Sequence, residues 1–360
     1  MLHLPERYKE LGDSSEGGMG TVIFCNDLVL ERTVAIKIIN NKSDHRRMLD
    51  ELAALMQVRS KHVVQVYDFL EINGRGLGIV QEYIDGMDLF ESLEGKRQST
   101  NSFYKDLWQI ASGISDIHDV GVIHRDIKPN NIKTDPEGVI KIFDFGLARN
   151  DGPEACTLGF IGTHGFAAPE LYHHSAEFTS AVDVYAFGAT ALFLGLGRLP
   201  KELVHSYSRV ENSDFFSSLS FYIAPALVDV LNQCLHPDPT ARPPITVVRD
   251  ELARHILYDM HQALVVYKGQ AKYLGARQRT ITLKLNERGT INNIGNVMIE
   301  YDGLQFKVVK VSGEVFINNA AVATGDELPG SCVVGLGNSQ RESFNRAFIT
   351  FDLSHPEIVL

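Results

Sequence analysis

The stretch HRDIKPNN, His124–Asn131, decides the fold of this chain through the spacing of its polar residues. Asp126 stands shortly before Lys128, and the amide of Asn131 closes the stretch. A second acid, Asp144, opens the triplet DFG downstream. An acid that accepts a proton, together with an acid and an amide that bind Mg²⁺, is the set of groups that phosphoryl transfer from a nucleotide requires. The spacing therefore predicts a phosphoryl-transfer site.

Three further elements follow the order that this chemistry needs. VAIK ends at Lys37 in a β-branched run, which would present an ammonium group to phosphates from a strand. Glu51 lies on the next segment of helical period and is positioned to pair with that lysine. APE occupies Ala168–Glu170. Each element alone also suits an ordinary strand, helix or turn, but their joint order favours one site.

Together these motifs resemble the eukaryotic-type (Hanks-type) serine/threonine protein kinase family over residues 7–260. The resemblance implies an α+β, bilobal protein-kinase fold, with a β-rich N-lobe at residues 1–84 and an α-helical C-lobe at residues 85–262. It also implies that ATP and Mg²⁺ are used to phosphorylate serine and threonine hydroxyl groups of proteins, including the activation segment of the chain itself. The compact architecture resembles bacterial members.

The resemblance assigns roles to the residues of the catalytic site. Asp126 would accept the proton of the substrate hydroxyl, and Lys128 would neutralise charge on the transferred phosphoryl group. Lys37 would contact the ATP phosphates while it pairs with Glu51. The Mg²⁺ ligands would be Asn131 and Asp144.

The glycine-rich stretch DSSEGGMGTV, Asp13–Val22, would cover ATP. Ser15 stands where the family usually has its first glycine, so we expect ATP affinity to be modestly weaker at most. Gln81 would occupy the gatekeeper position beside the adenine. The residues expected to bind ATP are Gly17, Gly18 and Gly20 at the phosphates, Val22, Ala35 and Lys37 further in, and Glu82 to Ile84 at the hinge.

The activation segment, Asp144–Glu170, carries the expected regulatory residues. Arg125 precedes the catalytic acid, so its guanidinium could hold a phosphate on this segment. Thr157 is the candidate phosphosite, with an ordinary loop residue as the alternative, and Thr163 is expected to bond the catalytic acid and lysine. Arg242 is expected to pair with Glu170. The residues expected to pack between the lobes are Leu55, His124, Phe145 and Asp183.

The whole chain has 360 residues, which predicts two or three domains, and a net charge of −11, which disfavours a general nucleic-acid binder. The four cysteines form no CxxC pair, which speaks against a zinc site or a disulfide framework and favours a cytoplasmic protein with reduced thiols. The apolar segment from Ala181 contains Asp183 and is short for a membrane span, so it predicts a buried helix.

After an expected linker at residues 263–272, short alternating runs predict an all-β sandwich over residues 273–360. Its closing part, VFINNAAVATGDELPGSCVVGLG, resembles a forkhead-associated (FHA) domain, a family that binds phosphothreonine through an arginine and a Ser-x-x-His pair. Asn293 and Asn296, on an expected loop, replace that pair, and Arg277 or Arg279 would have to supply the cation. Two hypotheses follow: a degenerate phosphopeptide-binding module, or a structural platform for a protein partner or a dimer.

The residues that inactive relatives of the family usually lose are all present, namely Lys37, Asp126 and Asp144. We therefore expect an active enzyme. The alternative is a pseudokinase-like scaffold that binds nucleotide and signals through its C-terminal β domain.

Overall fold

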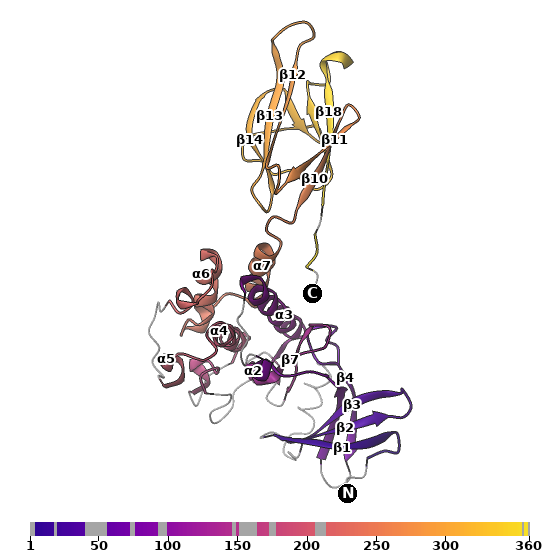
Figure 1. Cartoon of the computed structure of the whole chain (residues 1–360), viewed down its shortest axis with the longest axis vertical. Coiled ribbons are helices and arrows are strands. Elements are labelled where there is room, and N and C mark those ends of the chain that lie inside the picture. The colour runs from indigo at the N-terminus through magenta and orange to yellow at the C-terminus, as the bar shows by residue number, and fades with distance from the viewer. Residues whose placement is uncertain are drawn as a thin grey trace. The chain divides into compact units, whose positions relative to one another are not determined.

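The computed structural model describes residues 4–17, 20–39, 56–72, 76–92, 99–145, 149–150, 164–172, 178–205, 214–354 and 356–358. The chain forms two compact units, residues 1–252 and residues 253–359 (Figure 1). The first unit joins a β-sheet to a helical part, and the second is built from strands. This confirms the predicted α+β class.

The first unit begins with a five-stranded antiparallel sheet in the order β1-β2-β3-β5-β4. β3 shows why this sequence makes such a sheet. Its residues Val34, Ile36 and Ile38 are buried in the hydrophobic core of the sheet, whereas Ala35 and Lys37 alternate with them and project from the opposite face. The strands are β1 Tyr8–Gly17, β2 Gly20–Asp27, β3 Arg32–Ile39, β4 Val66–Ile72 and β5 Gly76–Glu82.

The rest of the first unit is mainly helical. Its longest helix, α3, spans Thr100–Asp119 and starts where Ser99 accepts a hydrogen bond from the backbone N–H of Ser102 (3.2 Å). The other helices are α2 Leu89–Ser92, α4 Ala181–Leu196, α5 Lys201–His205, α6 Pro225–Cys234 and α7 Ile245–Ile256. The shorter elements are β6 Val122–Ile123, η1 Pro129–Asn131, β7 Ile132–Thr134, β8 Ile140–Ile142, β9 Arg149–Asn150, η2 Pro169–Tyr172, η3 Phe216–Ser218 and η4 Pro239–Ala241.

Helix α4 is the buried helix that the sequence predicts. A Cβ on Gly188 would lie 2.9 Å from the Cβ of Cys234, so glycine lets α4 and α6 approach closely. Among the described residues, no helix combines the length and apolar character that crossing a membrane demands. The described cysteines, Cys25, Cys234 and Cys332, are buried and free.

The second unit is a sandwich of two antiparallel sheets (Figure 1). One sheet has six strands in the order β11-β10-β18-β17-β15-β16, and the other has three in the order β12-β13-β14. Their inner faces share one hydrophobic core, to which Val297, Ile299 and Phe351 belong. The strands are β10 Gln262–Tyr267, β11 Gln270–Gly275, β12 Thr280–Asn286, β13 Asn293–Tyr301, β14 Phe306–Gly313, β15 Val315–Ile317, β16 Ala320–Ala321, β17 Cys332–Leu336 and β18 Ala347–Leu353. A short 3-10 helix, η5, spans Ser343–Asn345.

Two local expectations for this region differ from the structure. Residues 263–272, expected as a linker, form β10 and part of β11, because their apolar residues alternate into the sandwich core. Asn293 and Asn296, expected on a loop, lie in β13, which is the central strand of its sheet and is paired on both sides.

The asparagine pair Asn318–Asn319 forms a turn between β15 and β16. Ile317 pairs with Ala320 across it, and both asparagines have positive φ angles, 48° and 69°. This is the geometry of a two-residue hairpin turn, which asparagine tolerates well.

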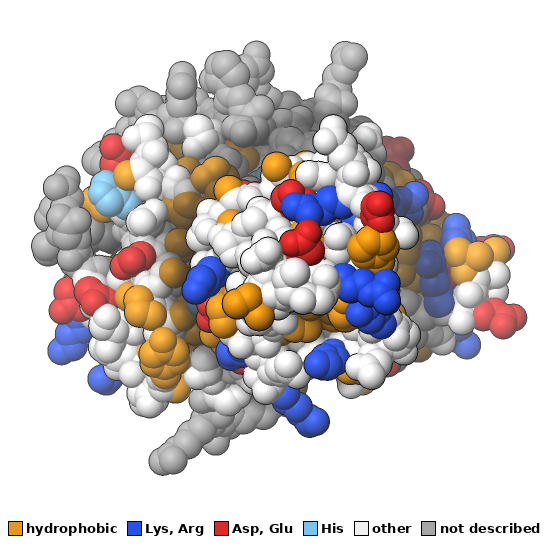
Figure 2. Space-filling model, turned by 90° about the horizontal axis from the view of Figure 1, so that it is seen from above, with side chains coloured by type: hydrophobic (Ala, Val, Ile, Leu, Met, Phe, Trp, Pro, Cys, Tyr) orange, Lys and Arg blue, Asp and Glu red, His pale blue; other side chains and the backbone are white. Residues whose placement is uncertain are grey.

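On the face of the molecule in Figure 2, acidic, basic and hydrophobic side chains are interspersed.

Candidate active site

Asp183, in the first turn of α4, holds the backbone that leads into the catalytic motif. One carboxylate oxygen accepts the backbone N–H of His124 (2.8 Å) and the other accepts that of Arg125 (2.7 Å). The ring of His118 lies 2.9 Å from the same carboxylate. Burial alone would raise the pKa of Asp183, but the hydrogen bond and charge of His118, with the backbone donor of Arg125, lower it. The ionised carboxylate therefore clamps this turn.

His124 is a fully buried, neutral side chain with one defined tautomer. Its Nε2 lies 3.1 Å from the carbonyl oxygen of Phe143, and its Nδ1 lies 3.3 Å from the backbone nitrogen of Asp126. A carbonyl only accepts and a backbone N–H only donates, so the ring proton resides on Nε2. Burial lowers the pKa of His124 although three acids surround it. The ring also packs on Phe145, with centroids 4.7 Å apart.

Asp126, Lys128 and Asn131 meet as the sequence spacing predicts. Lys128 Nζ donates to Asp126 Oδ2 at 2.7 Å, and Asn131 Nδ2 donates to the same oxygen at 2.9 Å. Asn131 Nδ2 also donates to the backbone oxygen of Asp126 (2.8 Å). The carboxylate of Asp126 is almost fully buried and is held in one orientation by two donors.

Asp144 follows β8 and contacts Lys37 directly. The period of β3 places this lysine on the face of the sheet opposite the core. Burial would raise the pKa of Asp144, but the charge and hydrogen bond of Lys37 lower it, and the charge of Lys128 acts in the same direction. Asp144 is therefore an ionised carboxylate, close enough to Lys128, the partner of Asp126, to be stabilised by its charge.

Backbone hydrogen bonds also join these two segments. Phe143 donates its N–H to the carbonyl oxygen of Asn131 at 3.0 Å, while its own carbonyl accepts from His124. Arg125 and Asp144 have left-handed backbones, with φ of 69° and 68°. Such a conformation costs a non-glycine residue about 1–3 kcal/mol and persists only where the surrounding structure supports it.

The nucleotide-binding residues expected from the sequence lie on the N-terminal sheet. Gly17 pairs with Gly20 at the tip of the β1–β2 hairpin, and Ser15 pairs with Val22 in extended backbone, which accepts a side chain. Gly18, between them, lies outside the described residues. Ala35 pairs with Phe24 on one side and with Gln81 on the other.

Glu82, which the sequence places at the expected hinge, has hydrogen-bonding partners for both its backbone and its side chain. Its backbone N–H donates to the Gln65 carbonyl oxygen (2.9 Å), and its carboxylate is 2.8 Å from Lys141 Nζ. A ligand contact made by the Glu82 backbone would therefore use its carbonyl oxygen. Ile84 is buried just beyond the end of β5.

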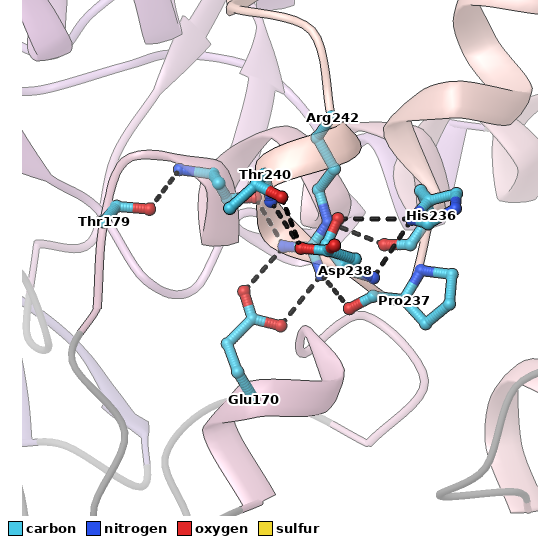
Figure 3. Close-up of polar contacts among 8 residues, drawn as sticks. Glu170, Thr179, His236, Pro237, Asp238, Thr240 and Arg242 are labelled. Carbon is cyan, nitrogen blue, oxygen red and sulfur yellow. Dashed lines mark hydrogen bonds and ion pairs between the residues drawn. The ribbon is translucent and has the colours of Figure 1, made fainter.

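Arg242 and Glu170 form the predicted ion pair (Figure 3). The guanidinium donates to both carboxylate oxygens, at 2.6 and 2.8 Å, and also to the backbone oxygens of Ala181, His236 and Pro237. It lies over the ring of Tyr185, 5.0 Å from the centroid. The pair therefore ties η2 to the start of α4 and to the segment around η4.

Several expected residues lie outside the described residues, namely Glu51, Leu55, Thr157 and Thr163, so their roles stay predictions. Two features were not expected from the sequence: the hydrogen bonds that Asp183 accepts from the backbone of His124 and Arg125, and the contact between Lys37 and Asp144. An acid inside an otherwise apolar helix was the available signal for the clamp, because a buried carboxylate needs donors. Residues far apart in sequence leave no such local signal for the contact.

Comparisons with known proteins identify the family of this chain. A family model described as "Protein kinase domain" matches residues 6–253. The probable serine/threonine-protein kinase pknA2 of Bifidobacterium longum is 35% identical over 207 residues, 54% of this chain and 27% of the relative. The CBL-interacting serine/threonine-protein kinase 8 of Arabidopsis thaliana is 30% identical over 253 residues, 67% of this chain and 56% of the relative.

PknA of Corynebacterium glutamicum is 34% identical over 196 residues, 51% of this chain and 42% of the relative. The chain thus spans between 27% and 56% of the length of these three relatives. Since the family model covers well over half of the chain, this protein belongs to the protein kinase domain family.

Proposed function

We propose that the protein transfers the γ-phosphoryl group of ATP to serine and threonine hydroxyl groups of proteins, its own activation segment included. The observation that carries this proposal is the Asp126 carboxylate, which Lys128 and Asn131 hold in one orientation. Family membership and the serine/threonine kinases among the relatives support it. Their names also support the choice of hydroxyl.

In the proposed reaction, the substrate hydroxyl oxygen forms a bond to the γ-phosphorus. The bond from that phosphorus to the bridging oxygen breaks, and ADP leaves. The hydroxyl proton passes to the Asp126 carboxylate, which acts as the base. Lys128, within hydrogen-bond distance of Asp126, is positioned to offset negative charge on the transferred group.

Asn131 and Asp144 fit a Mg²⁺ ion through the chemistry of their donor atoms. Mg²⁺ prefers oxygen ligands and uses one or two carboxylates together with substrate phosphates. The amide nitrogen of Asn131 is directed at Asp126, so its amide oxygen faces elsewhere, and the lowered pKa of Asp144 keeps its carboxylate ionised at neutral pH. Bound Mg²⁺ would neutralise charge on the phosphate oxygens.

For ATP, we propose that Lys37 contacts the phosphates and that the β1–β2 hairpin tip, Gly17 to Gly20, covers them. The adenine would lie between Val22 and Ala35, with the Glu82 carbonyl and the Ile84 backbone as hydrogen-bonding partners. The location of Lys37 beside Asp144 supports this assignment. The role of Glu51 as partner of Lys37 belongs to the same proposal.

For regulation, we propose that Arg125 holds a phosphate on Thr157 and that Thr163 bonds Asp126 and Lys128. Arg125 is buried, and its guanidinium lies 4.8 Å from the centroid of the Phe178 ring. Such a stacked guanidinium is well ordered for binding phosphate. Mass spectrometry of fully active protein should find phosphate on Thr157, and an unmodified segment would contradict this role.

For the second unit, we propose a β-sandwich of FHA type that binds a protein partner. The asparagine turn and the two-sheet architecture support this type. Arg279, a candidate phosphate ligand, instead donates to both carboxylate oxygens of Asp259, at 2.8 and 2.6 Å. Asn293 and Asn296 lie within a strand rather than on a loop. These two observations favour a protein platform over a phosphopeptide-binding module.

A peptide titration separates these two hypotheses. The full chain is titrated with a phosphothreonine peptide and with its unphosphorylated counterpart. We expect no difference in affinity. Tighter binding of the phosphorylated peptide, retained in Asp126→Ala, would instead establish phosphopeptide recognition.

Incubation with labelled ATP tests the proposed activity. The wild type should label itself and serine or threonine residues of added protein, whereas Asp126→Ala should transfer no label. The matched control is Asp229→Ala, because Asp229 is an exposed acid on α6. Label transfer by Asp126→Ala at the wild-type rate would contradict the mechanism, and no transfer by the wild type would favour the nucleotide-binding scaffold.

A further inference from the structure

The outer face of the six-stranded sheet is unusually apolar. Strand pairing places Leu264 beside Tyr273, and Val266 beside Ala271, on the side of β10 and β11 that is turned away from the core. The opposite side of β10, with Ala263 and Val265, faces the core. Tyr273 is 63% exposed. These neighbours therefore form an apolar surface where solvent-facing residues are usually polar.

The same surface continues across the sheet. Val333 on β17 lies opposite Thr350, and Phe348 on β18 lies opposite Gly335, which in turn pairs with Phe316. Val333 is 36% exposed and Phe348 is 55% exposed. We define the outer sheet face by the residues Leu264, Val266, Tyr273, Phe316, Val333 and Phe348.

The other sheet shows the contrast. On the outer side of β12, β13 and β14, one row across the strands is Thr282, Met298 and Lys310, and the next is Lys284, Asn296 and Ser312. This side is mostly polar and charged, as expected for a sheet in contact with water. The apolar character is therefore specific to the outer sheet face.

The outer sheet face also carries little net charge. Two ionisable groups of opposite sign lie on it: Asp352, opposite Leu264, accepts a hydrogen bond from Ser331, and the Arg346 guanidinium lies 4.8 Å from the centroid of the Phe348 ring. The chain as a whole has a net charge of −11, so most contacts between two copies would bring like charges together. On the outer sheet face, two copies can meet without that repulsion.

The edges of the same sheet are protected against pairing with another strand. Edge strand β11 carries Lys272, opposite the core-facing Val265, and the other edge strand, β16, has only two residues. Inward-pointing lysines and very short strands are devices that block edge-to-edge association. Association through the face is therefore favoured over extension of the sheet.

We propose that the outer sheet face is a dimer interface, on which a second copy of this chain packs face to face. A two-fold axis sets the same patch against itself, so each copy supplies the apolar surface that the other needs. The six strands lie about 4.8 Å apart and have two to seven residues each, at about 3.3 Å per residue, which gives a face on the order of 450 Å². This lies within a factor of two of the roughly 800 Å² per partner of a stable interface.

Analytical ultracentrifugation of the full chain tests this proposal. The wild type should sediment at micromolar concentration with twice the 40.0 kDa mass of one chain. Phe348→Lys and Val333→Lys should each weaken the dimer about 100-fold or more, because each buries an unpaired charge at the centre of the face. Tyr273→Lys, at a highly exposed position near the edge, should weaken it without any risk to folding.

Thr282→Lys is the matched control, because it places the same charge on the outer side of the other sheet. It should leave the dimer intact, and circular dichroism melting should show all variants folded. Asp126→Ala should remain a dimer, which separates this proposal from the proposed activity. A monomeric wild type, or a folded Phe348→Lys and Tyr273→Lys that keep the wild-type mass, would overturn the proposal.

Discussion

Asp183 has no exposed surface and makes no proposed contact with a substrate. Its two carboxylate oxygens nevertheless accept the backbone N–H groups of His124 and Arg125, the two residues that precede the proposed base. Arg125 has a left-handed backbone, which needs support from its surroundings. Asp183 is therefore a positioning residue, and it acts through the backbone.

Asp183→Asn should keep the shape of the side chain and lose its charge. We expect kcat to fall at least about 10-fold with little change in the KM for ATP, because Asp126 is held less firmly while the proposed nucleotide-binding residues are unchanged. Steady-state kinetics of the variant beside Asp229→Asn would measure this. A rise in the KM for ATP alone would contradict the positioning role.

The charge of Asp183 also makes stability depend on pH. Its pKa in the folded chain lies below the ordinary value of 3.8, so the unfolded chain binds a proton first as pH falls. The stabilisation is therefore fully present above about pH 5 and is lost as pH falls below 3.8 towards the folded-state pKa. Urea denaturation should show the difference between wild type and Asp183→Asn shrinking in that acid range, and a constant difference would contradict it.

At the scale of elements, residues 62–64 run parallel to β8 and form hydrogen bonds with it. Val63 bridges Ile142, and Ile142 donates its N–H to the carbonyl oxygen of His62 at 2.9 Å. The ring of His62 adds a hydrogen bond from Nδ1 to the carbonyl oxygen of Ile140, 3.0 Å away. Burial lowers the pKa of His62, so the folded chain holds a neutral imidazole here.

A neutral buried His62 should make the fold less stable in mild acid. The unfolded histidine takes up a proton below its ordinary pKa of 6.5, whereas the folded one resists, so stability is lost as pH falls through that value. Between pH 7.5 and 5.5 we therefore expect the free energy of unfolding to decrease. His62→Gln should remove that part of the pH dependence in urea titrations. His255→Gln, at a less buried site, should leave the pH dependence of stability unchanged. Equal changes in both variants would contradict the role of His62.

The Arg242–Glu170 pair connects elements that are distant in sequence, so its loss should be costly. Arg242→Met would leave the Glu170 carboxylate without its donor and should lower the free energy of unfolding by about 3–5 kcal/mol. Asp250→Ala, which breaks the exposed pair with Arg249, should change it by less than about 1 kcal/mol. Chemical denaturation compares the two, and similar losses would show that Arg242 contributes no more than a surface charge.

At the scale of the whole molecule, each unit has its own hydrophobic core. Calorimetry should therefore resolve two unfolding transitions rather than one. Phe351→Ala, in the sandwich core, should lower the midpoint temperature of only one transition, and Phe187→Ala, in α4, that of only the other. Each variant should lower the free energy of unfolding of its own unit by about 3–5 kcal/mol. A single transition that both variants shift equally would show that the units unfold together.

Much of this architecture follows from local sequence patterns. Asp126, Lys128 and Asn131 lie within one short stretch, so their spacing alone predicts that they meet, and alternation in β3 predicts the face that Lys37 occupies. The pair Arg242–Glu170 could be predicted because two family motifs imply it. These residues are governed by short-range geometry or by a shared pattern.

Other features arise only from tertiary packing. The contact of Lys37 with Asp144 joins residues 107 positions apart. Asn293 and Asn296 read as loop residues because asparagine is common in turns, but the partners on both sides of β13 override that preference. The outer sheet face could not be predicted either, because it depends on which strands are neighbours.

The contact between Lys37 and Asp144 has a consequence for how ligands enter the site. Each group neutralises the other, so a phosphate that binds Lys37 takes over a partner from Asp144 and leaves that carboxylate open to a cation. Ligand binding thus replaces the ion pair between Lys37 and Asp144. A bound anion would raise the affinity for the cation, and a bound cation would raise the affinity for the anion by the same factor. With Lys37 and Asp144 in their proposed roles, the site would bind nucleotide or metal weakly when either is alone and more strongly when both are present.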